Sequence, residues 1–103
     1  MELSALRNSE VVEQIQSIAR DHTERVIILD HARLRMIERE ISYIQVLRVI
    51  SDGNPVSDIK WSDKKETGWR CQFRRITAGI EIDVAVKLVV RDGENTDLVL
   101  TVF

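Results

Sequence analysis

The sequence has few of the residues that mark several large classes of protein. Among its 103 residues there are one cysteine, one proline and four glycines. A single cysteine, Cys71, excludes an internal disulfide framework and fits a reducing cytoplasm. No apolar run approaches the roughly 20 residues that a membrane-spanning helix needs, and residues 1–4 lack the basic start and apolar stretch of a signal peptide. We therefore expect a cytoplasmic protein without a membrane partner.

The patterns of metal sites, of phosphate-binding glycine loops and of general polyanion affinity are also missing. The two histidines and one cysteine do not have the spacing of metal ligands, and the glycines stand singly at turns. We expect no metal and no cofactor. The formal net charge of -2 encodes no general attraction to nucleic acid, so any binding of a polyanion must come from a local patch.

The residues that are present have the balance of a globular protein, with 44% hydrophobic and 31% charged side chains. We expect a single domain over residues 1–103, made of an N-terminal helical extension (1–22) and a core (24–103). Helical periodicity predicts a first helix over 9–21, and a β-branched run predicts a strand over 24–29. A second helix is predicted from an N-cap at Asp30, with Leu34, Ile37 and Ile41 facing the core.

A third helix is predicted from Ser42, which has the spacing of a capping box with Gln45. Its expected inward residues are Ile44, Val46, Leu47 and Ile50. Gly53 is expected to end it in a left-handed conformation. After Pro55 the pattern changes to period two.

Strands are predicted over 56–61, 69–76, 80–91 and 96–103, with a hairpin turn at 92–95. Cys71 is expected to be inert core. In the last strand, Leu98, Leu100 and Val102 are expected inside and Asp97, Val99 and Thr101 outside. We predict an α+β fold: an N-terminal helix, a strand, two helices, and a twisted antiparallel sheet of about four strands.

The second predicted helix carries the first candidate site. His31, Arg35 and Arg39 are four residues apart and therefore form one stripe. Imidazole suits proton transfer near neutral pH, and the positive end of the helix dipole favours its neutral form. The guanidinium fork suits phosphate oxygens. The alternative is an ordinary solvated face, with Glu38 and neighbouring acids balancing the arginines.

The later strands carry a second candidate site, for RNA. Arg70 and Arg74 share a strand face, and Lys87 faces outward from the next strand. With Thr101 they would form a basic floor if the polar faces coincide, and Phe103 would stack a base beside it. A solvated sheet face is the alternative.

The run His31-Ala32-x-x-Arg35-Met36-x-Glu38-Arg39-x-Ile41-Ser42 resembles the signature of a small bacterial domain family of unknown function, H-A-x-x-R-M-x-E-R-G-I-S. The likeness covers roughly residues 26–103. Glu40 stands where that family favours glycine, which suggests that no left-handed break is needed there. The first helix lies outside the match.

The resemblance implies a fold like that of RelE-type toxins, which are typically metal-independent ribonucleases paired with antitoxins. It supports His31, Arg35 and Arg39 as the catalytic group, and Thr101 more weakly. The leading hypothesis is a toxin-type protein that acts on RNA and binds an antitoxin. One alternative is a non-catalytic interaction module whose arginine face holds an acidic partner. Another is a dimerising structural protein whose first helix covers a sheet edge or a second subunit, and the sequence leaves the oligomeric state open.

Overall fold

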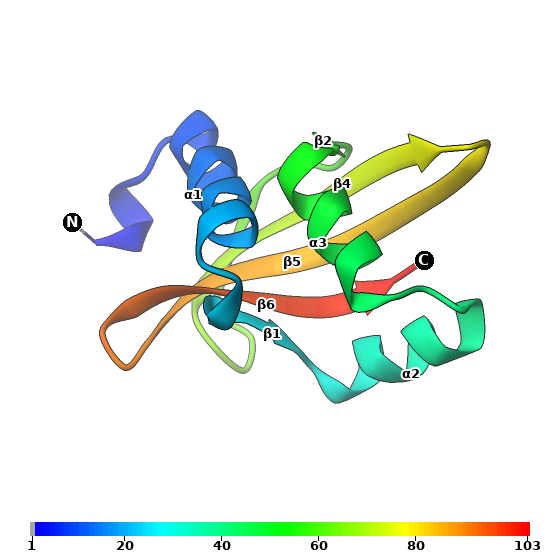
Figure 1. Cartoon of the computed structure of the whole chain (residues 1–103). Coiled ribbons are helices and arrows are strands. Elements are labelled where there is room, and N and C mark those ends of the chain that lie inside the picture. The colour runs from blue at the N-terminus through cyan, green and yellow to red at the C-terminus, as the bar shows by residue number, and fades with distance from the viewer. Residues whose placement is uncertain (1) are drawn as a thin grey trace.

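The computed structural model describes residues 2–103, which form three α-helices, two short 3-10 turns and six strands (Figure 1). The helices are α1 (Asn8–Asp21), α2 (Asp30–Arg39) and α3 (Tyr43–Asp52). The strands are β1 (Val26–Ile28), β2 (Asn54–Pro55), β3 (Lys60–Ser62), β4 (Gly68–Thr77), β5 (Ile80–Arg91) and β6 (Glu94–Val102). Within these residues no helix has both the length and the apolar character that crossing a bilayer requires.

The strands form one open sheet in the order β1-β6-β5-β4-β2, and β3 also pairs with β4. Most neighbours are antiparallel, whereas β1 runs parallel to β6. The α+β class and the order helix, strand, two helices, strands are therefore confirmed. The short β1 and β2 enlarge the expected antiparallel sheet at its two sides, and β1 makes it mixed.

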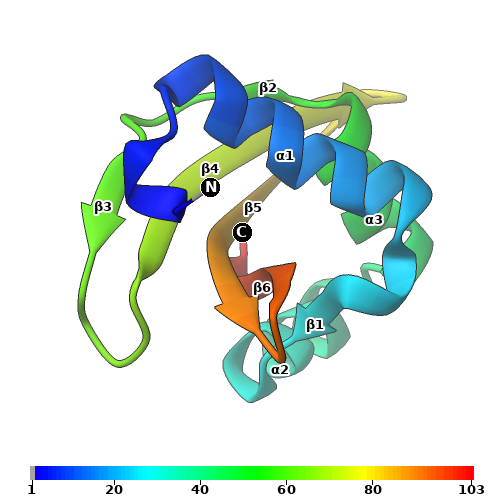
Figure 2. The ribbon, with the colours of Figure 1, turned by 90° about the vertical axis from the view of Figure 1, so that its left-hand side faces the viewer.

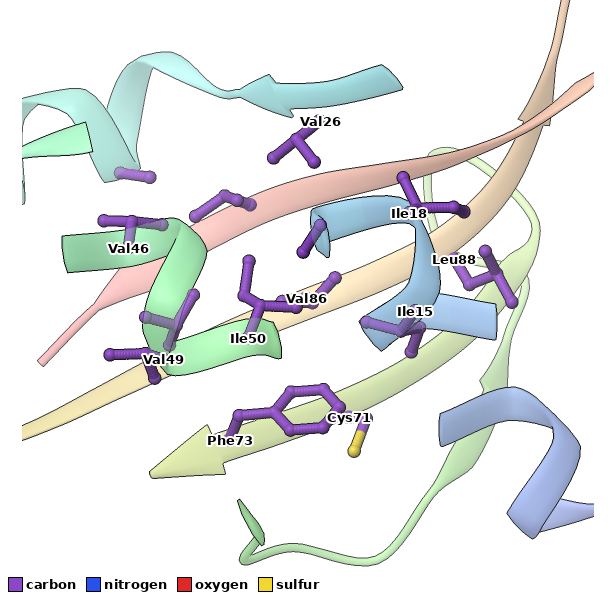
Figure 3. Close-up of a cluster of buried hydrophobic side chains, with 14 of the residues drawn as sticks. Ile15, Ile18, Val26, Val46, Val49, Ile50, Cys71, Phe73, Val86 and Leu88 are labelled. Atoms are coloured by element: carbon purple, nitrogen blue, oxygen red, sulfur yellow. The ribbon is translucent and has the colours of Figure 1, made fainter. Parts of the chain in front are cut away.

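Helices α1 and α3 pack on one face of the sheet, and the hydrophobic core lies between (Figures 1 and 3). Figure 3 shows Ile15 from α1 and Ile50 from α3 directed toward Val86 and Phe73 on the strands. All four side chains are fully buried. Burial of this kind is worth about 1.5–3 kcal/mol for each large aliphatic side chain, so α1 is part of the core.

The sequence signals at the helix ends were partly right. Ser42 caps α3, accepting from the Gln45 amide while the Gln45 side chain accepts from the Ser42 amide. Asp30, in contrast, is not an N-cap: it is the first residue inside α2, and Leu29 precedes it without a side-chain bond. Gly53 does not adopt a left-handed conformation either, since its φ is -79°. Glycine fits there because a Cβ would collide with the carbonyl oxygens of Val49 and Arg74.

Two residues of the predicted apolar stripe of α2, Leu34 and Ile37, face outward, which contradicts the prediction for them, whereas Ile41, just after the helix, packs against the core as predicted. These side chains are 60% and 71% exposed, and Ala32 is the buried residue of the helix. The reason is the position of α2, which continues from β1 at the side of the sheet and contacts β6 (Figure 1). An element at the side of a sheet can bury only a narrow strip. Ile44, at the start of α3, is likewise exposed rather than inward.

The face of β6 that enters the core is the one that was predicted to face outward. Asp97 and Val99 pair with Leu88 and Val86 of β5 and enter the core with them, whereas Leu98 pairs with Lys87 on the other face. A register shift between Ala85 and Val86 then accommodates one extra residue on β6. That shift returns Val102 to the core, as predicted. Leu98 is also buried, as predicted, but on the open face of the sheet, where Leu100 is half-buried beside it.

The predicted strand over 56–61 is also wrong in its bounds. Strand structure occurs before it, in β2, and at its end, in β3, and both segments pair with β4. The residues between them follow the edge of β4 irregularly: the Val56 amide donates to the Gln72 carbonyl, and the Ser57 hydroxyl accepts from the Gln72 amide.

Candidate functional site

A cavity of about 590 Å³ lies on the face of the sheet opposite α1 and α3. Figure 2 shows these two helices on one side of the curved strands, with α2 and the β3–β4 loop away from them. The cavity is lined by Leu29, His31, Ser62, Lys64, Lys65, Glu66, Arg70, Lys87, Arg91, Leu98 and Leu100. Its volume falls within the range of pockets that hold small molecules.

Lys87 is the innermost charge of this cavity. Its side chain is on the open face of β5, yet the residue is only 6% exposed. The Nζ donates to the Lys64 carbonyl oxygen at 2.9 Å and, at the long distance of 3.5 Å, to the Ser62 hydroxyl. No carboxylate oxygen of residues 2–103 lies within 4.0 Å of the Nζ. A buried ammonium with only neutral acceptors is energetically unfavourable unless an anion joins it.

Other cations surround Lys87. Arg70 is its direct neighbour across the β4–β5 pair, and Lys64 and Lys65 approach from the β3–β4 loop. The lining contains five lysine or arginine side chains and one carboxylate. The chain as a whole has a net charge of -2, so positive charge is concentrated at this cavity.

The one carboxylate in the lining is already neutralised. Glu66 receives two hydrogen bonds from the Arg91 guanidinium, at 2.9 and 2.6 Å. These bonds, with smaller contributions from the charges of Arg91 and Lys87, hold the pKa of Glu66 below its usual range. The pair fixes the β3–β4 loop to β5 and leaves Lys64, Lys65, Arg70 and Lys87 without a carboxylate partner in the described chain.

His31 is the only residue of the predicted stripe that lines the cavity. It arrives there because β1 runs parallel to β6 and ends where the Leu29 amide donates to the Val99 carbonyl, so the first turn of α2 borders the open face. Arg35 instead donates to the Val102 carbonyl oxygen and lies 3.8 Å from Glu38. Arg39 is exposed at the far end of α2. Each step of four residues moves about 6 Å along a helix, which carries the two arginines away from the cavity.

The predicted basic floor forms in part. Arg70 and Lys87 meet in the cavity, whereas Arg74 binds the Asp83 carboxylate at 2.8 and 3.0 Å and lies 3.5 Å from Glu81. The bonds from Arg74, with a further one from Gln72, hold the pKa of Asp83 below its usual range. This cation therefore already has its anions.

Two further predicted residues, Thr101 and Phe103, are not among the lining residues. Thr101 pairs with Ala85. Phe103 is half-exposed after the end of β6, where its amide donates to the Asp83 carbonyl.

Eight lining residues were not predicted from the sequence as site residues, namely Ser62, Lys64, Lys65, Glu66, Arg91, Leu29, Leu98 and Leu100. The adjacent pair Lys64-Lys65 in a polar turn was a usable signal, because a turn beside a sheet can fold over its open face. Nothing local indicated Leu98 and Leu100, since their face depends on the pairing with β5.

Cys71 lies outside this cavity, within the core. Burial raises the pKa of its thiol to about 11, so it has the properties of a small apolar side chain rather than of a nucleophile. No group of three potential metal-ligating side chains occurs within residues 2–103.

The fold and the cavity define a small α+β domain with a cationic pocket on the open face of its sheet. By sequence, the chain belongs to a family described as a domain of unknown function (DUF4258), whose profile matches residues 28–103. The expected membership in a small domain family of unknown function is thus confirmed, and the match leaves out α1, as expected. No curated protein and no solved structure matches the chain. The likeness to RelE-type toxins stays a prediction.

Proposed function

We propose that this protein binds RNA by its phosphate groups in the cationic cavity and cleaves it as a metal-independent ribonuclease of the toxin type. The observation that carries the proposal is Lys87, which is 6% exposed and, like the neighbouring Arg70, has no carboxylate oxygen of residues 2–103 within 4.0 Å. Two of the three Lys87 donors have neutral oxygen acceptors. A phosphate oxygen in the cavity supplies the third acceptor and the missing negative charge.

The cleavage step assigns one role to each neighbouring group. The His31 imidazole takes the proton of a ribose 2′-hydroxyl, and the 2′-oxygen attacks the adjacent phosphorus. The bond from phosphorus to the 5′-oxygen breaks, and the 5′-oxygen leaves with a proton from water. The hydroxide that remains takes the proton from the His31 imidazolium, so the products are a 2′,3′-cyclic phosphate and a free 5′-hydroxyl. Lys87 and Arg70 hold the charge that develops on the phosphate oxygens. Arg35 and Arg39 take no part in this step, because they lie away from the cavity.

The toxin type and the cytoplasmic location follow from the resemblance of the α2 motif together with this chemistry. Uncontrolled cleavage of cellular RNA harms the cell, so this activity agrees with a toxin that is paired with an antitoxin. The buried free thiol of Cys71 suits a reducing cytoplasm.

Two substitutions test binding and chemistry separately. We expect Lys87→Met to weaken the binding of a short single-stranded RNA at least tenfold and to reduce the salt dependence by about one phosphate contact. The control is Arg48→Met, which removes an exposed arginine of α3 outside the cavity. Fluorescence anisotropy at several salt concentrations measures the affinity of each variant and its salt dependence. Equal affinity of the Lys87→Met and Arg48→Met variants would overturn the proposed binding site.

Cleavage is measured with the same RNA in the presence of EDTA. We expect His31→Ala to lower the rate by about 10²–10⁴ while leaving the affinity within a factor of about three. A His31→Ala variant that cleaves at the wild-type rate rejects the catalytic role of His31.

A second candidate function, a non-catalytic protein-interaction module, is favoured by the exposed face of α2. Leu34 and Ile37 are adjacent on this helix and largely exposed, and an apolar pair of this kind is suited to a partner surface. The test is co-purification with the product of the neighbouring gene by size-exclusion chromatography. A complex that forms with wild type but not with Leu34→Ser/Ile37→Ser, without cleavage of RNA, selects this function over the first.

A further inference from the structure

The lining of the cavity changes chemical character from one side to the other. One row of paired residues crosses the open face of the sheet, in the order Lys60, Arg70, Lys87, Leu98 and Ile27. Its three middle members line the cavity, and Lys60 and Ile27 continue the row beyond it on either side. Three cations on β3, β4 and β5 are followed directly by apolar side chains on β6 and β1. Neighbouring strands are about 4.8 Å apart, so the change from cationic to apolar takes place over a single strand spacing.

The apolar side consists of three leucines that converge from two segments. Leu98 and Leu100 lie on β6, and Leu29 joins β1 to α2. Leu98 is 3% exposed at the base of the cavity, whereas Leu29 and Leu100 are half-buried. Leu98 and Leu100 are two residues apart on β6 and therefore lie on the same face of the sheet. Three leucines beside a buried lysine are not needed to bind a phosphate alone. They form an apolar surface that a phosphate group cannot use.

We infer that the cavity binds one unstacked nucleotide of a single-stranded RNA, with its phosphate on Lys87 and Arg70 and its base against Leu29, Leu98 and Leu100. The inference rests on the proposed function and deepens it by naming the substrate class. In a nucleotide, the anionic phosphate and the flat base are roughly 5–10 Å apart, which is the distance across one to two strand spacings. The cavity has the volume for one such unit.

Duplex RNA does not satisfy this arrangement. Its bases are paired and stacked inside the helix, and its shallow groove exposes mainly phosphates, 2′-hydroxyls and base edges. A duplex would reach the cations on the rim and leave the leucine side empty. The cavity therefore discriminates against duplexes because a paired base cannot reach the leucines, and not because the charge of the two RNA forms differs.

The first experiment compares ligands on the wild-type protein. Anisotropy is measured with a labelled single-stranded 12-mer and with the same strand in a duplex, and unlabelled uridine 5′-monophosphate and ribose 5-phosphate are used as competitors. We expect the single strand to bind at least tenfold more tightly than the duplex. We expect the nucleotide to compete at least tenfold better than ribose 5-phosphate, which has the phosphate and sugar but no base.

The second experiment uses a matched pair of variants. Leu100→Ser removes a half-buried leucine from the cavity, and Ile44→Ser removes an exposed apolar side chain outside it. We expect Leu100→Ser to lower the affinity for the single strand about tenfold and to abolish the advantage of the nucleotide over ribose 5-phosphate. We expect Ile44→Ser to change neither.

The outcomes separate this inference from the proposed function. If RNA binds through Lys87 but single strand, duplex and both competitors behave alike, phosphate binding stands and the nucleotide pocket is rejected. If neither form of RNA binds, or Lys87→Met binds as well as wild type, the proposed function fails and the inference fails with it. The competition on wild type needs no substitution, so it decides the question even if Leu100→Ser does not fold.

Discussion

Glu40 occupies a backbone conformation that favours glycine. It ends α2 with a φ of 54° and a ψ of 44°, and the Ile41 amide donates to the Met36 carbonyl across the turn. The absence of glycine at this position predicted that no left-handed break occurs, and this prediction is wrong. Side chains with a Cβ are disfavoured in this region by about 1–2 kcal/mol, and Glu40 remains there because the connection to Ser42 and α3 requires it.

Replacement of Glu40 by glycine should therefore stabilise the protein. We expect Glu40→Gly to raise the free energy of unfolding by about 1 kcal/mol, measured by urea denaturation. Glu40→Gln is the control, because it removes the unfavourable negative charge at the helix C-terminus and keeps the Cβ. If the glutamine variant gains as much as the glycine variant, charge rather than backbone conformation is responsible.

Asp97 is a carboxyl group inside the hydrophobic core. It is fully buried between Val26 and Leu88 on the neighbouring strands, and neither carboxylate oxygen has a hydrogen-bond partner within residues 2–103. Burial raises the pKa of Asp97 well above its usual range, and the charge of Arg25 opposes this only in part. The side chain is therefore protonated at pH values where an exposed aspartate is ionised.

The raised pKa of Asp97 makes the folded state bind its proton more tightly than the unfolded state does. This contribution to stability is complete below the unfolded pKa of about 4 and is lost as pH rises through the folded pKa. We expect the stability of wild type relative to Asp97→Asn to fall above pH 4 by up to about 1.4 kcal/mol per pH unit. Urea denaturation at pH 4 to 8 measures it.

The groups with lowered pKa values act in the opposite direction and in another pH range. Glu10, Glu66 and Asp83 are held by arginine bonds, so their stabilising contributions are lost as pH falls below about 4. These residues are shared by wild type and Asp97→Asn, and their effects cancel in the difference. A difference that stays constant from pH 4 to 8 would contradict the raised pKa of Asp97.

At the scale of elements, α2 shows how a helix with an amphipathic pattern can face solvent with its apolar side. It contacts β6, where Arg35 donates to the Val102 carbonyl, while Ala32 is buried in the core cluster and Met36 packs against it. Leu34 and Ile37 point away from these contacts. Their role, if α2 carries a partner surface, is in binding and not in folding.

Truncation of an exposed apolar residue should therefore change the free energy of unfolding less than truncation of a buried one. We expect Leu34→Ala and Ile37→Ala each to change the free energy of unfolding by less than about 0.5 kcal/mol. Ile50→Ala in α3, which is fully buried, should cost about 2–5 kcal/mol. Urea denaturation of the three variants provides the comparison. A loss above 2 kcal/mol for Ile37→Ala would mean that α2 packs inward.

For the whole molecule, α1 is a necessary part of the core although it lies outside the family match. It buries Val11, Ile15, Ile18 and Ala19 almost completely. It is also tied to distant segments: the Gln16 side chain donates to the Gly53 carbonyl, and the Asn95 side chain donates to Gln14. The preceding turn accepts the Trp69 indole hydrogen bond at the Leu3 carbonyl, at 2.7 Å.

Removal of the N-terminal segment should therefore abolish cooperative folding. We expect a chain of residues 23–103 to show no sigmoidal urea transition and no native near-ultraviolet circular dichroism, because β5 and α3 lose their apolar cover. Within the full chain, Ile15→Ala should cost about 2–5 kcal/mol, and Glu13→Ala, on the exposed side of α1, less than about 0.5 kcal/mol. A truncated chain that unfolds cooperatively would show that residues 23–103 are an independent domain.

Much of the fold was predictable because its signals are local. The capping box at Ser42, the alternation along β5 and the inward face of Cys71 and Phe73 on β4 depend on neighbours a few residues apart. For the candidate site, the same reasoning identified His31, Arg70 and Lys87, which are three of the cavity's lining residues. Local periodicity is sufficient to say which side chains share a face.

Which face becomes covered is decided by the packing of segments that are far apart in the chain. Either face of β6 contains apolar residues, so only its register with β5 places Asp97 in the core and Leu98 in the cavity. In the same way, the cavity exists because the β3–β4 loop brings the Lys64 carbonyl to Lys87. Residue patterns determined the elements of this protein and their amphipathic faces. The tertiary structure decided which faces meet, because the free energy of burial depends on the partner surface as well as on the pattern itself.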